Sequence, residues 1–146
     1  MTIPLLLINT LATFFLSGLI WFVQIVHYPL FQFTGGANFK PYHQRHTQWT
    51  GYVVIVPMLV ELGTSALLLR YHDGIAFNLT IVAFVLVIII WLSTFLLQVP
   101  AHSALSGQKE DAIIARLVRT NWIRTVSWSI KSLINLFLLW NLLNNA

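Results

Sequence analysis

The stretch QIVHYPLFQFTGGANFKPYHQRHTQWTG, residues 24–51, separates two long apolar segments and decides how the whole chain is interpreted. It closes the first apolar segment, which begins near the N-terminus, and leads directly into the second. It also contains three of the five histidines, His27, His43 and His46. Since polar residues are concentrated here, we expect the apolar flanks to cross a membrane and this connection to carry the chemistry.

The composition excludes several classes of protein. The 146 residues are 58% hydrophobic and only 8% charged, which is too little charge for the surface of a soluble domain of this size. The absence of cysteine excludes disulfides, thiolate nucleophiles, iron–sulfur ligation and covalent attachment of a c-type haem. The eight Lys and Arg residues stand mainly at the ends of apolar segments, where they orient a protein in a membrane. We therefore expect a lipid bilayer as partner and no nucleic acid.

Four segments are long enough to cross a bilayer, namely residues 3–31, 49–70, 75–99 and 122–143. Each holds about 20 or more mostly apolar residues, the length that a hydrocarbon core of ~30 Å requires of a helix. Short connections, including a tight turn at residues 71–74, predict a single all-α domain over residues 1–146, an integral membrane antiparallel four-helix bundle. Short interfacial helices are expected in the first and third loops.

Basic residues predict the orientation. One side of the membrane receives the first loop, the third loop and the start of the fourth span, which carry Lys40, Arg45, Lys109, Arg116, Arg119 and Arg124. The opposite side receives Arg70. The positive-inside rule then predicts cytoplasmic long loops and both termini outside, in what we expect to be a bacterial inner membrane.

Polar residues recur at helical spacing within the spans. Thr10, Thr13, Ser17, Gln24 and His27 share one face of the first span. The fourth span repeats the pattern with Asn121, Thr125, Ser132 and Asn135. We expect these faces to meet in the bundle, where the Ser and Thr residues form hydrogen bonds between helices.

Glu61 differs from the other polar residues because it lies near the centre of the second span, where an ionisable group is costly. Helices two and four run in the same direction in the predicted bundle, which places Lys131 at a similar depth. The sequence leaves two interpretations open: a structural ion pair between Glu61 and Lys131, or a functional carboxylate that transfers protons.

The histidines form a second candidate site. His43 and His46 are spaced i, i+3, and His27 and His102 are expected at the same cytoplasmic end of the bundle. Four imidazoles at one level would hold a haem or a metal ion, with His43 and His46 as the cofactor-binding residues. The alternative is a set of solvated or hydrogen-bonded histidines. No separate metal site is predicted.

Arg124 and Asn121 complete this site at the start of the fourth span, at the depth where His27, Gln24 and Gln98 emerge. A guanidinium at that position would hold a carboxylate, phenolate or quinone oxygen. The alternative for Arg124 is contact with lipid headgroups.

Two segments carry a family resemblance: residues 98–102, QVPAH, and residues 121–125, NWIRT. They resemble a pattern in the anthrone-oxygenase-like family of small four-helix membrane proteins, whose members leave helix three through Val-Pro and a polar residue. His102 stands where asparagine is more usual. The resemblance implies the four-helix frame and, for some members, oxygenation of polycyclic phenols such as anthrones.

These observations lead to one main functional hypothesis and two alternatives. We expect a small oxidoreductase or oxygenase that acts on a flat aromatic or quinone-type molecule, with Arg124 and Asn121 on an oxyanion and His27 or His102 exchanging protons. The first alternative is a non-catalytic subunit or assembly factor of a larger membrane complex. The second is a proton-coupled carrier built on Glu61, which would require a homo-oligomer.

Overall fold

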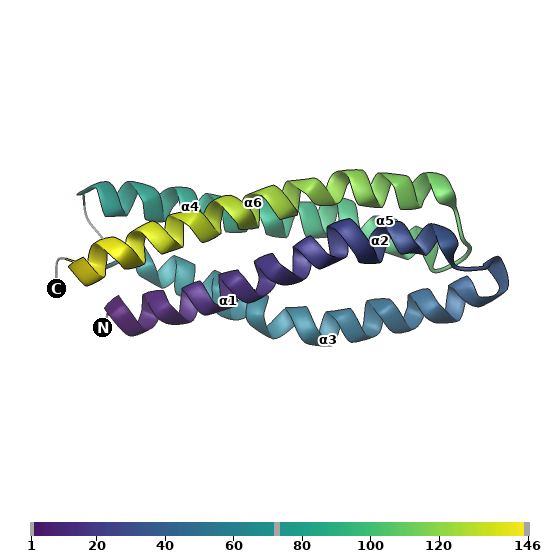
Figure 1. The fold of residues 1–146 in the computed structure, drawn as a ribbon, viewed down its shortest axis with the longest axis horizontal. Coiled ribbons are helices and arrows are strands. Elements are labelled where there is room, and N and C mark those ends of the chain that lie inside the picture. Colours follow the sequence, from purple (N-terminus) through teal and green to yellow (C-terminus); the bar gives the residue numbers. More distant parts are fainter. Residues whose placement is uncertain (1, 72–73, 145–146) are drawn as a thin grey trace.

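The computed structural model describes residues 2–71 and 74–144, so part of the turn predicted at residues 71–74 lies outside the described residues. The elements along the chain are α1 (Thr2–Phe22), η1 (Val23–His27), α2 (Tyr28–Leu30), η2 (Phe31–Phe33), α3 (Gly36–Leu68), α4 (Gly74–Ser93), η3 (Thr94–Gln98), α5 (Val99–Leu105) and α6 (Asp111–Asn144). They form four long antiparallel helical rods, with both termini at one end (Figure 1). The predicted all-α four-helix bundle is confirmed.

All four rods are candidates to cross a membrane: Ile3–Phe33, Gly36–Leu68, Ala76–Leu105 and Asp111–Asn144. Large apolar side chains on each rod point outward, among them Leu11, Val56, Leu96 and Leu133. Such a continuous apolar exterior is expected where lipid, and not water, surrounds the bundle. These features are those of an integral membrane protein.

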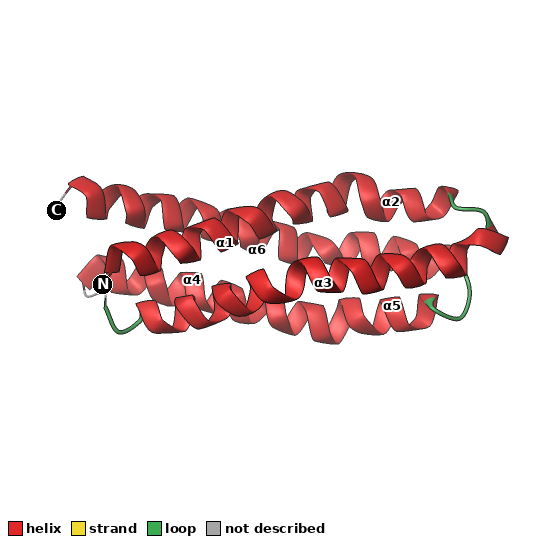
Figure 2. Ribbon diagram, turned by 90° about the horizontal axis from the view of Figure 1, so that it is seen from below, coloured by secondary structure: helices red, strands yellow, loops and turns green. Residues whose placement is uncertain are grey.

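The two predicted interfacial helices differ from expectation. Their residues are helical, but they continue without interruption into the second and fourth spans as parts of α3 and α6 (Figure 2). α3 contains two prolines, Pro41 and Pro57, and α6 contains neither Gly nor Pro. α3 nevertheless continues as one helical element through both prolines.

The rods are longer than a bilayer core requires. A helix of 33 residues measures about 50 Å at 1.5 Å per residue, whereas the hydrocarbon core is about 30 Å thick. The excess in α3 lies at its polar N-terminal end, around Lys40 and Arg45. The bundle thus extends past the apolar layer at the end opposite the termini.

Two π-helical segments interrupt the first and third rods, and each is followed by a proline. Pro29 lies two residues after η1, and Pro100 lies two residues after η3. A proline clashes with the carbonyl group four residues earlier, and that carbonyl lies inside the π-helical segment in both cases. The wider turn accommodates this clash, and it ends on a histidine in η1 and on a buried glutamine, Gln98, in η3.

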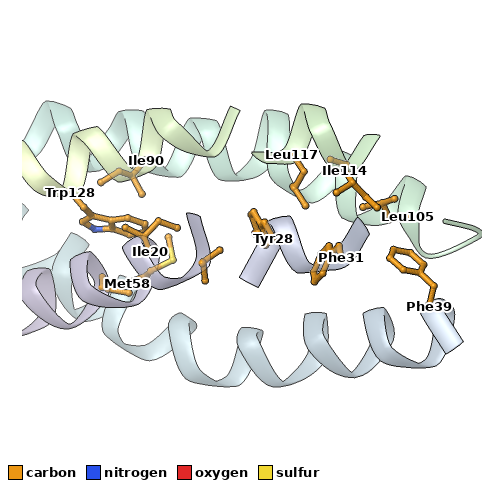
Figure 3. Close-up of a cluster of buried hydrophobic side chains, with 13 residues drawn as sticks. Ile20, Tyr28, Phe31, Phe39, Met58, Ile90, Leu105, Ile114, Leu117 and Trp128 are labelled. Atoms are coloured by element: carbon orange, nitrogen blue, oxygen red, sulfur yellow. The ribbon is translucent and has the colours of Figure 1, made fainter. Parts of the chain in front are cut away.

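The principal apolar core runs from the middle of the bundle to the end remote from the termini (Figure 3). Trp128, Ile20 and Met58 lie at one end of this core, Phe31 and Phe39 lie toward the other, and Tyr28 lies between them. α1 packs against α3 and α6, and α6 also packs against α4. This packing places α6 at the centre of the polar contacts described next.

Candidate functional site

The four histidines that the sequence places at one end do meet there. His27 ends η1, His43 and His46 lie on α3, and His102 lies on α5. The Nε2 atom of His27 is 2.6 Å from Nδ1 of His46, and Nε2 of His43 is 3.0 Å from Nδ1 of His102. In each pair one ring nitrogen donates and the other accepts, because a neutral imidazole has one of each.

Aromatic rings enclose this histidine cluster. Phe31 makes edge contacts with His27, His43, His46 and His102. Phe39 stacks on His43 at a ring-centroid distance of 5.5 Å. The exposed fraction of His43 is 1%, so this side chain faces the interior of the bundle and not water. The sequence left open whether histidines that bind no cofactor would be solvated or hydrogen-bonded. The structure shows hydrogen-bonded histidines.

The cluster as arranged does not form a set of metal ligands. Within residues 2–71 and 74–144, no group of three or more His, Cys, Asp or Glu side chains is positioned to hold a metal ion. The ring nitrogens instead face one another in pairs. The Nδ1 atom of buried His43 has no hydrogen-bond partner among the described residues. A haem or metal at His43 and His46 thus stays a prediction that this geometry does not support.

Tyr28 links the histidines to α6. Its hydroxyl lies 3.0 Å from Nε2 of His102 and accepts a hydrogen bond from Nη2 of Arg124 at 3.3 Å. Arg124 also donates from Nε to Oδ1 of Asn121 at 2.9 Å, and Nδ2 of Asn121 donates to Oε1 of Gln24 at 2.8 Å. One hydrogen-bonded chain therefore runs from Gln24 to His102.

Arg124 points into the bundle, with 8% of its surface exposed. The sequence position of Arg124 also allowed contact with lipid headgroups. A side chain buried inside the bundle does not make that contact. Gln98, which was expected at the same depth, donates from Nε2 to Oγ1 of Thr120 at 3.1 Å. Its Oε1 atom is buried and has no hydrogen-bond partner in the described part of the chain.

Glu61 and Lys131 form a separate network nearer the termini. Nζ of Lys131 lies 3.4 Å from Oε1 of Glu61, and both side chains are buried. Glu61 also accepts from Thr13 at 2.8 Å and from Nε1 of Trp128 at 3.0 Å. Lys131 donates to Asn9 at 2.8 Å. Both carboxylate oxygens have partners, which favours the ion-pair interpretation of Glu61.

A large groove lies on the outside of the bundle, between α1, η1 and α3. Its volume is about 700 Å³. Its apolar walls come from Leu19, Phe22, Val23 and Val53, and its polar end comes from His27, Tyr42, Arg45 and His46. Phe22, Trp49 and Val53 are exposed at its mouth, on the surface that faces lipid. The groove thus runs from exposed apolar side chains on the outside of the bundle to His27 and His46.

A smaller interior cavity of about 60 Å³ adjoins the groove. The two share the lining residues Leu19, Val23 and Thr50. Arg124 and Tyr28 line the interior cavity and do not line the groove. The predicted site is therefore divided: His27 and His46 line the outer part, and Arg124 lines the inner part.

Tyr28 and Asn9 are members of these networks that the sequence reasoning missed. Asn9 lies four residues before Thr13 and so carried a usable signal, because i and i+4 share a helix face. Tyr28 carried none, since an aromatic residue near a membrane exit is ordinarily an interface anchor.

No family model, no curated protein and no solved structure matches this chain. The resemblance to the anthrone-oxygenase-like family therefore stays a prediction from two short segments.

Proposed function

We propose that this protein is a small membrane oxidoreductase or oxygenase that acts on a flat aromatic or quinone-type molecule taken from the bilayer. The observation that carries the proposal is the groove that ends at the paired imidazoles of His27 and His46. Its volume of about 700 Å³ lies within the range of roughly 300–1,000 Å³ typical of small-molecule sites.

The lining favours a ring system over a flexible chain. Trp49 and Phe22 present aromatic surfaces at the mouth, and Leu19 and Val53 supply apolar walls. Because the mouth faces lipid, a molecule dissolved in the bilayer enters sideways without crossing water. Polar groups at one end of an otherwise apolar pocket then orient the ring, as is usual for such sites.

The chemistry begins with proton transfer at His27, which lines the groove. A neutral imidazole takes a proton from an acidic O–H or C–H bond of the ligand, R–H, and leaves the anion R⁻. His46 shares the added proton across the 2.6 Å contact. With dioxygen as oxidant, R⁻ and O₂ form R–OO⁻, and the imidazolium returns the proton to give R–OOH. Atoms and charge balance as R–H plus O₂.

We also propose where the protein is located and how it is oriented in the membrane. The end that carries the histidine cluster also carries Lys40, Arg45, Lys109, Arg116 and Arg119. By the positive-inside rule this end lies in the cytoplasm of a bacterial cell and the termini lie outside the inner membrane. The ligand site is then at the cytoplasmic boundary of the bilayer.

The test measures oxygen consumption by the purified protein in lipid nanodiscs, with anthrone as the probe. We expect turnover by the wild type and a loss of at least about 100-fold in His27→Gln, the lower end of what general-base removal costs. Val53→Trp fills the groove and should also abolish turnover. Leu133→Trp, on the exposed lipid face of α6, is the matched control and should leave it unchanged.

Two outcomes would overturn the proposal. One is a wild type that consumes no oxygen with anthrone or with a hydroquinone, which would favour a non-catalytic subunit. The other is turnover that persists in both His27→Gln and Val53→Trp.

A further inference from the structure

Arg124 is a buried cation without an anion. The salt bridges among the described residues join Lys109 to Asp111 and Lys131 to Glu61, and Arg124 takes part in neither. Its hydrogen-bond acceptors, Oδ1 of Asn121 and the hydroxyl of Tyr28, are neutral groups. Burying a guanidinium without a counter-charge is costly, and in a membrane protein such a residue usually faces a partner or a cavity.

Arg124 does face a cavity. The interior space of about 60 Å³ is bordered on its polar side by Arg124, Tyr28 and Thr50. The remaining lining is mostly apolar, including Ile20 and Met58. Since one water occupies about 30 Å³ of liquid volume, the space suits one or two small polar groups. It is too small for a ring system, which the groove next to it accommodates.

The position of the cavity connects it to the groove. Leu19, Val23 and Thr50 line both spaces, so the cavity that contains Arg124 lies next to the groove. The hydroxyl of Thr50 also lies 3.2 Å from Nδ1 of His46, which pairs with His27. The proton-accepting histidines and the unpaired cation therefore line two adjoining spaces.

We infer that the interior cavity is the oxyanion subsite of the groove and binds the ionised oxygen of an aromatic phenol or enol whose ring lies in the groove. This inference rests on the function proposed for the groove. The negative charge that appears when His27 removes a proton is compensated by the guanidinium of Arg124. When Nε2 of His102 is protonated and donates to the Tyr28 hydroxyl, that hydroxyl keeps its own proton as a second hydrogen-bond donor for the ligand. A ligand that stays neutral leaves Arg124 without its counter-charge and binds less tightly.

The ionisation state of a coloured phenol tests this subsite directly. The phenolate of 4-nitro-1-naphthol absorbs visible light at longer wavelength than the phenol, so the spectrum of the bound probe gives the ratio of the two forms. At fixed pH in nanodiscs, we expect the wild type to raise the phenolate-to-phenol ratio at least about ten-fold over protein-free nanodiscs, the lower end of the effect of a neighbouring guanidinium.

Variants assign the effect to Arg124. Arg124→Gln should return the ratio to the protein-free value, and Arg124→Lys should retain part of the increase because it keeps the charge. Arg116→Gln, which removes an exposed arginine from the same helix, is the matched control and should leave the ratio unchanged. The helical circular dichroism of each variant shows whether it is folded.

The outcomes separate this inference from the proposed function. If the bound probe keeps its protein-free ratio in the wild type, or if Arg124→Gln keeps the wild-type ratio while folded, the subsite is overturned and the groove stands. An equal loss in Arg116→Gln would also overturn it, since surface charge would then be the cause. If the wild type binds no probe, or Val53→Trp binds it as well as the wild type, the groove itself is overturned.

Discussion

Two regions of the bundle each bury a cation from α6, and they differ in what stands opposite it. Arg124 and Lys131 are seven residues apart, which places them on the same face of the helix about 10 Å apart along its axis. Lys131 meets the carboxylate of Glu61, and both have further hydrogen bonds. Arg124 meets neutral groups and a cavity among the described residues.

Lys131 has the carboxylate of Glu61 beside it and Arg124 has no carboxylate among the described residues. This difference favours a structural role for Lys131 and a binding role for Arg124. In the Lys131 region, Asn9 and Thr13 of α1 and Trp128 of α6 form hydrogen bonds with the ion pair, so both of its members have further partners. In the Arg124 region, the guanidinium is hydrogen-bonded to the neutral groups of Asn121 and Tyr28 and lines the cavity of about 60 Å³. We therefore propose that the first region holds the helices in register and that the second binds a ligand.

The largest expected effect comes from breaking the paired region. Lys131→Met leaves the carboxylate of Glu61 buried without its cation, which should lower the free energy of unfolding by about 3–5 kcal/mol. The measurement is the thermal unfolding midpoint in mild detergent, followed by circular dichroism. The double variant Glu61→Gln with Lys131→Met is the control and should recover most of the loss. A Lys131→Met protein as stable as the wild type would show that the pair is not structural.

An intermediate effect should follow from making the Arg124 region resemble the Lys131 region. Thr50→Glu places a carboxylate in the wall of the interior cavity, where it supplies the missing anion. We expect the roughly ten-fold preference for bound phenolate to disappear while the fold is kept. Thr50→Gln, similar in size but neutral, should keep the preference. Equal behaviour of the two variants would mean that size, and not charge, governs the subsite.

The smallest expected effect comes from removing one hydrogen bond at the surface of the bundle, and it serves as the reference for the two buried regions. Nε1 of Trp21 donates to Oγ of Ser129 at 3.0 Å on the outside of the bundle, away from both cations. Ser129→Ala should lower the free energy of unfolding by about 0.6 kcal/mol, the average for one interhelical hydrogen bond in a membrane. The same detergent unfolding assay measures it. A loss comparable to that of Lys131→Met would mean that the buried pair is no more important than a surface contact.

Much of the Glu61 network was predictable, and the reason is geometric. Glu61 and Lys131 lie at matching positions of two spans that run in the same direction, so the antiparallel order of four helices was enough to bring them together. The structure confirms the pair at 3.4 Å. The depth of each residue in its span follows from its distance along the helix, which can be counted from the sequence alone.

The Arg124 site was predictable only in part, because η1 changes the helical register. With regular spacing from Gln24, the residue expected on the inner face is His27. The wider π-helical turn shifts the following residues, so that Tyr28 is buried and His27 is half-buried at the groove. Sequence spacing alone therefore assigned His27 to the site but left out Tyr28, which connects His102 to Arg124.

By itself, the sequence determined that the chain forms four apolar helices able to cross a membrane, and that these carry polar faces and one deep carboxylate. Those properties depend on residue type, length and helical period, which are local. Only the tertiary structure decided that α3 and α6 extend as single helices, that the histidines pair within a ring of aromatic side chains, and that Arg124 faces a cavity beside the groove. These features depend on how helices that are distant in the chain are rotated and shifted relative to one another. Side-chain packing and the π-helical turns together determine that rotation and shift.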